Sequence, residues 1–69
     1  MRQEIIDTMR RLDYSALVDI AVTFNMIDHN QLADFNDNLL KASFFTNLRK
    51  KIKQRALADE NIAEYVLLY

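Results

Sequence analysis

The sequence contains neither glycine nor proline among its 69 residues. The common hairpin turns require positive φ and depend largely on glycine, so their absence argues against a β-rich fold. Six asparagines and seven aspartates remain to cap helices and form tight connections, because both types tolerate the left-handed conformation comparatively well. We therefore expect an all-α fold, a compact bundle of three to five short helices with Asp- and Asn-capped connections, in a single domain over residues 1–69.

Cysteine is also absent, and the chain has one histidine. Disulfides and thiolate metal sites are thereby excluded, although a domain this short usually needs some such staple. Self-association is the remaining means of stabilising so short a chain, and we expect a homo-oligomer. A chain without cysteine fits a reducing compartment, so we expect a cytoplasmic protein. No signal-peptide pattern and no membrane-spanning apolar run are present.

The first half of the chain carries apolar residues at helical spacing. They follow one another at steps of three and four, which trace one face of a helix: Ile5, Met9, Leu12, Ala16, Ile20, Phe24 and Ile27. One long helix would satisfy this pattern. Asp13 or Ser15 could instead cap a second helix. We favour two helices, over about 3–12 and 15–26.

The second half predicts further helices. Asp28 and Gln31 have the spacing of a capping box, and an apolar stripe follows. Asn36-Asp37-Asn38 contains three poor helix formers, which could split the segment into helices near 29–35 and 38–57. Asp59 is positioned to cap a last helix of ten residues. Because residues 65–69 would also suit a short strand, that alternative stays open.

Catalytic residues are not evident. His29 is the only histidine and follows a capping aspartate, and nothing in the spacing brings Ser15 or Ser43 toward it. An active site also needs several groups converging in a pocket, which a chain this short can hardly form. We therefore expect no enzyme activity, no cofactor and no small-molecule substrate.

An oxygen-rich stretch over residues 28–39 has a superficial likeness to a calcium loop. Alternate positions supply carboxylates and amides, but Ala33 stands where the loop needs glycine and Leu39 where it needs a bidentate glutamate. Asp and Asn at a helix start explain the same residues. We expect no metal site.

Basic residues are concentrated late in the chain. Residues 41–55 carry six basic and no acidic side chains, and five of the six lie within seven residues: Arg49, Lys50, Lys51, Lys53 and Arg55. Three interpretations are open: a solvated helix face, a site for an acidic protein partner, or a site for nucleic-acid phosphates. The net charge of −1 weighs against nucleic acid.

Apolar residues are in excess at two places. Phe44 and Phe45 are adjacent on a helix and so point about 100° apart, and the chain ends in a run of apolar side chains. We predict Phe44, Phe45, Tyr65, Leu68 and Tyr69 as apolar anchors for a partner. The leading hypothesis is a non-enzymatic protein-interaction module, a regulator, inhibitor or small subunit. A small nucleic-acid-binding regulator using the basic cluster is the alternative.

Overall fold

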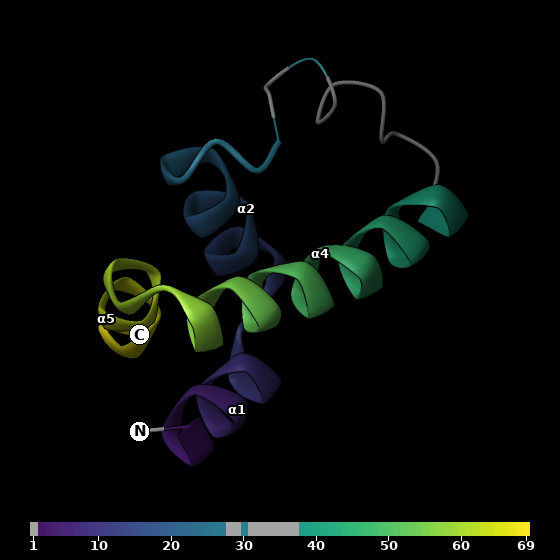
Figure 1. Ribbon diagram of the computed structural model, residues 1–69. Coiled ribbons are helices and arrows are strands. Elements are labelled where there is room, and N and C mark those ends of the chain that lie inside the picture. The colour runs from purple at the N-terminus through teal and green to yellow at the C-terminus, as the bar shows by residue number, and fades with distance from the viewer. Residues whose placement is uncertain (1, 28–29, 31–37) are drawn as a thin grey trace.

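Four helices make up nearly all of the chain that the computed structural model describes, which is residues 2–27, 30 and 38–69 (Figure 1). They are α1 (Arg2–Arg11), α2 (Tyr14–Thr23), α4 (Asn38–Ala58) and α5 (Glu60–Leu67). No strand occurs in these residues, so the predicted all-α fold is confirmed. Asp28 and Gln31, the predicted capping pair, and nearly all of the predicted 29–35 helix lie outside the described residues.

Aspartate caps begin two of the helices. The Asp13 carboxylate accepts a hydrogen bond of 2.9 Å from the backbone N–H of Ala16, which satisfies one free donor at the start of α2. Asp59 accepts one of the same length from the N–H of Asn61 and begins α5. The Asp59 cap was predicted, and Asp13 is the cap where the sequence offered Asp13 or Ser15; this first cap confirms two separate helices before residue 28.

An asparagine ends α2. Asn25 has a φ of 57°, and its N–H donates to the carbonyl of Val22 at 3.2 Å. The N–H of Met26 donates to the carbonyl of Ala21 at 2.7 Å, which completes the pattern that usually requires glycine after a helix. The prediction that this helix reaches residue 26 was therefore wrong by three residues, because Asn25 adopts the left-handed conformation.

The longest helix, α4, is the centre of the bundle. In Figure 1, α2 lies above it, α1 lies below it and α5 packs at its C-terminal end. Its 21 residues extend about 30 Å at 1.5 Å per residue, and its N-terminal end reaches beyond the other helices. Within the described residues, no helix combines the length and the apolar character needed to cross a membrane.

One cluster of buried apolar side chains joins all four helices. α4 contributes the stripe predicted from sequence, with Phe45, Leu48, Ile52 and Ala56 buried. The other contributors are Ile5, Met9, Leu12, Ala16, Leu17, Ile20, Ala21, Met26, Ile62, Ala63 and Val66. The last three come from a helix that runs to Leu67, so the alternative of a strand over residues 65–69 was wrong.

Candidate interaction surface

Two of the five residues in the basic cluster connect α4 to its neighbours. The Arg49 guanidinium donates to the backbone carbonyl of Met9, which lies in the last turn of α1. On the opposite side of α4, the Lys51 amine donates to the carbonyl of Met26 at 3.4 Å, just after α2. Carbonyls near a helix C-terminus are short of donors and carry partial negative charge, so both cations are favourably placed.

The other cations of the cluster do not connect helices. Lys50 and Arg55 are exposed and Lys53 is half-buried. Among the described residues, none of the three side chains forms an ion pair or a hydrogen bond. The five cations therefore divide by role: Arg49 and Lys51 hold helices together, while Lys50, Lys53 and Arg55 face outward.

A shallow groove lies between α1 and α4, lined by Ile6, Met9, Arg10, Arg49, Lys50 and Lys53, with a volume of about 130 Å³. We call it the α1–α4 groove. Its apolar lining comes from α1, and four cations from both helices surround that lining. The Arg10 side chain is 75% exposed and lies 3.9 Å from the Asp7 carboxylate. An exposed pair of this kind is weak and leaves the guanidinium able to bind another anion.

Phe45 does not lie on the surface. Its ring is 5% exposed and stacks on Tyr14, with the ring centroids 4.4 Å apart. Phe44 is half-buried and meets Phe45 edge to face at 5.1 Å. The pair therefore widens the buried side of α4. Phe45 packs in the core and is not available as a partner-binding anchor.

The predicted C-terminal anchors have different environments. The hydroxyl of Tyr65 donates to both oxygens of Asp19 in α2, at 3.1 and 3.0 Å, and the Tyr69 hydroxyl donates to the same carboxylate. Thr23 also donates to Asp19, at 3.3 Å. The two tyrosine hydroxyls therefore connect the C-terminal segment to α2. Leu68 is 82% exposed.

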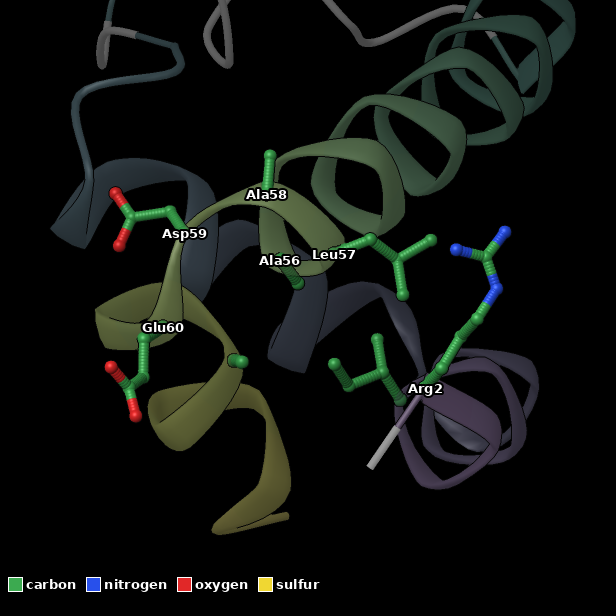
Figure 2. A pocket seen from close by; sticks show the side chains of 8 residues that line it. Arg2, Ala56, Leu57, Ala58, Asp59 and Glu60 are labelled. Atoms are coloured by element: carbon green, nitrogen blue, oxygen red, sulfur yellow. The ribbon is translucent and has the colours of Figure 1, made fainter.

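A wider depression of about 380 Å³ lies where α1 meets the α4–α5 corner (Figure 2). Its lining combines alanine, isoleucine and leucine side chains with the charged groups of Arg2, Asp59 and Glu60. In Figure 2 the two carboxylates point away from the side on which the Arg2 guanidinium lies. Because these groups do not converge, the depression offers no pair that could act together on a bound molecule.

Three features of the surface were missed from the sequence. Arg10 joins the basic cluster across the α1–α4 contact, Asp19 collects three hydroxyl donors, and Ile6 supplies apolar lining to the groove. The Arg10-Arg11 pair was a visible basic signal, but its proximity to Lys50 depends on tertiary packing. His29 and most of the calcium-like stretch lie outside the described residues.

Comparison with known proteins gives no family: no family model, no curated protein and no solved structure matches this chain. In the described part of the chain, no three histidine, aspartate or glutamate side chains gather closely enough to hold a metal ion. The α1–α4 groove and the exposed side chains around it are therefore the features that bear on function.

Proposed function

We propose that this chain is a non-enzymatic interaction module of the cytoplasm that binds an acidic, partly apolar segment of a larger protein. It acts as a regulator, an inhibitor or a small subunit of that protein. The observation that carries this proposal is the α1–α4 groove, in which Lys50, Lys53 and Arg10 surround apolar side chains. Apolar contact at the centre and charge at the rim are typical of protein-binding sites.

Charge and rigidity both favour an acidic segment. Lys50 and Lys53 have no acidic partner among the described residues, so an incoming carboxylate does not need to displace one. Arg49 is already held by the Met9 carbonyl, which fixes one wall of the groove before any partner arrives. Less side-chain entropy is then lost on binding, and the remaining cations steer the approach of the partner.

The predicted anchors contribute unequally to this proposal. Phe44, Tyr65 and Tyr69 are partly occupied by intramolecular ring contacts, and the two tyrosines also by Asp19. Leu68 is the anchor with the most surface to offer. A partner that reaches from the groove to the end of α5 would gain both electrostatic and apolar contact.

The test is affinity capture from host-cell extract, with and without nuclease, using matched charge variants. Lys50→Glu with Lys53→Glu reverses two groove cations, whereas Arg2→Glu with Arg55→Glu makes the same change in net charge outside the groove. We expect a protein that survives nuclease treatment, is retained by wild type and by the Arg2/Arg55 variant, and is lost with the groove variant. Equal retention by all three chains would contradict the proposal.

Nucleic-acid binding is the second candidate, supported by the outward-facing Lys50, Lys53 and Arg55. Arg49 and Lys51 already donate to backbone carbonyls, which leaves three of the five cluster residues for phosphates. Because the salt dependence of binding scales with the number of phosphates neutralised, about three contacts predict weak, non-specific retention. Capture that disappears on nuclease treatment would favour this candidate over the protein partner.

A further inference from the structure

The outward side of α5 is the chemical complement of the α1–α4 groove. Glu60, Glu64 and Leu68 are spaced four residues apart, so they form a row along one side of the helix, which we call the α5 outer face. Both glutamates are exposed, and Leu68 is 82% exposed. The row therefore combines two negative charges with one apolar side chain.

The α5 outer face cannot reach the groove of its own molecule. The opposite side of α5 buries Ile62, Ala63 and Val66 against the rest of the bundle, so the glutamates point away from it. Among the described residues, Glu60 and Glu64 form no ion pair. Two unpaired and complementary surfaces thus lie on separate parts of the molecule.

We propose that the α1–α4 groove of one molecule binds the α5 outer face of a second copy of this chain. The inference rests on the proposed function, because it assigns an occupant to the same groove. Glu60 and Glu64 are one helical turn apart, and so are Lys50 and Lys53, so both charge pairs can form with the helices side by side. Leu68 then lies against the apolar lining of the groove.

The two surfaces share no residue, which makes the contact heterologous. Each bound molecule still presents one unoccupied groove and one unoccupied α5 outer face, so association continues head to tail until a ring closes or growth stops. An eight-residue helix buries little area, and much of the attraction is between exposed charges. The association is therefore weak, grows with protein concentration and is opposed by salt.

The test is sedimentation velocity on two complementary variants of the full chain. The groove variant carries Lys50→Glu and Lys53→Glu, and the face variant carries Glu64→Gln and Leu68→Ser. For each variant alone, we expect association to weaken at least about tenfold relative to wild type, which is the effect of about 1.4 kcal/mol. The Arg2→Glu/Arg55→Glu variant serves as the charge control and associates as wild type does.

Mixing the two variants gives the decisive measurement. The intact α5 outer face of the groove variant meets the intact groove of the face variant, so an equimolar mixture forms a one-to-one dimer that grows no further. Wild type continues to larger species at the same total concentration. Circular dichroism verifies that each variant is folded, and Lys50→Gln with Lys53→Gln replaces the groove variant if charge reversal unfolds it.

Two results would overturn the inference: a wild-type chain and a mixture that both stay monomeric at high concentration, or association that neither variant weakens. Capture of an acidic partner through Lys50 and Lys53 would survive either result, because it needs only the groove. Self-association with no captured protein would support the groove as a binding site and overturn only the part of the proposed function that names a larger protein as its partner. The two proposals can thus fail separately.

Discussion

At the scale of single residues, Asn25 takes the place that glycine usually occupies after a helix. Its φ of 57° lies in the left-handed region, where a Cβ atom crowds the following carbonyl and costs most residues about 1–2 kcal/mol. Asparagine reduces that cost through local hydrogen bonding by its short polar side chain. In a chain without glycine, this residue determines where α2 ends.

We expect Asn25→Val to lower the free energy of unfolding by about 1–2 kcal/mol, because valine cannot adopt this conformation without strain. Asn47→Val in α4 is the matched control and should change stability little, since asparagine and valine have similar helix propensities. Asn25→Gly should be neutral or stabilising. Urea denaturation followed by circular dichroism measures all three, and equal losses at both valine sites would contradict the role of Asn25.

Sequence patterns predicted the residues that act locally. Asp59 was predicted as a cap, and Asp13 was one of two candidates with Ser15, because a cap depends on side-chain type and on a spacing of a few residues. The left-handed turn at Asn25 was missed, because Asn25 stands between Phe24 and Ile27, which continue the apolar pattern. Periodicity indicates where a helix face lies and does not reveal a local change of backbone conformation.

At the scale of elements, α4 is joined to the helices beside it by two cations on its opposite sides. Arg49 satisfies a carbonyl in the last turn of α1, and Lys51 satisfies one beyond the end of α2. The basic side chains of the cluster therefore lie around α4 and do not form one face of this helix. Arg49 is not part of a solvated face, because its guanidinium binds the Met9 carbonyl, whereas Lys50 and Arg55 are exposed.

We expect Arg49→Met to lower the free energy of unfolding by about 1.5 kcal/mol, because the carbonyl of Met9 loses a charged donor. Lys50→Met also removes one positive charge, at the next position, and should change stability by less than about 0.5 kcal/mol. Thermal denaturation measures both variants at low protein concentration. A loss at Lys50 as large as that at Arg49 would show that α4 responds to total charge and not to this hydrogen bond.

At the scale of the whole molecule, one core depends on α4. Ile52 is 0% exposed at the middle of the buried stripe of this helix, where the other elements meet it. A chain of this size has a small reserve of stability, because a single core of this size rarely supplies more than about 3–5 kcal/mol. Loss of one α4 side chain therefore affects every helix together.

We expect Ile52→Ala to cost about 2–5 kcal/mol and to leave a large fraction of the chain unfolded at room temperature. Leu68→Ala removes an aliphatic side chain of equal size from an exposed site and should leave the stability of the dilute monomer unchanged. Circular dichroism and urea denaturation compare the two. A folded Ile52→Ala chain of nearly wild-type stability would contradict a core that depends on α4.

Assembly of the groove was beyond prediction from sequence. The Arg49 side chain and the Met9 carbonyl are separated by 40 residues along the chain, and nothing in the local pattern of either segment specifies the other. The same holds for Phe45, whose burial follows from the ring of Tyr14 that stacks on it. The amphipathic pattern predicted the helices and most of the core. Side-chain contacts between helices could not be predicted, because they depend on how the helices pack in three dimensions.

The carboxylate of Asp19, which holds the hydroxyls of Tyr65 and Tyr69, has an optical consequence. The chain has three tyrosines and no tryptophan, so phenol rings dominate its ultraviolet emission. An excited phenol readily passes its proton to a bonded carboxylate and then emits less light. Detachment of α5 from α2 therefore increases the tyrosine fluorescence, which reports on the contact between these two helices.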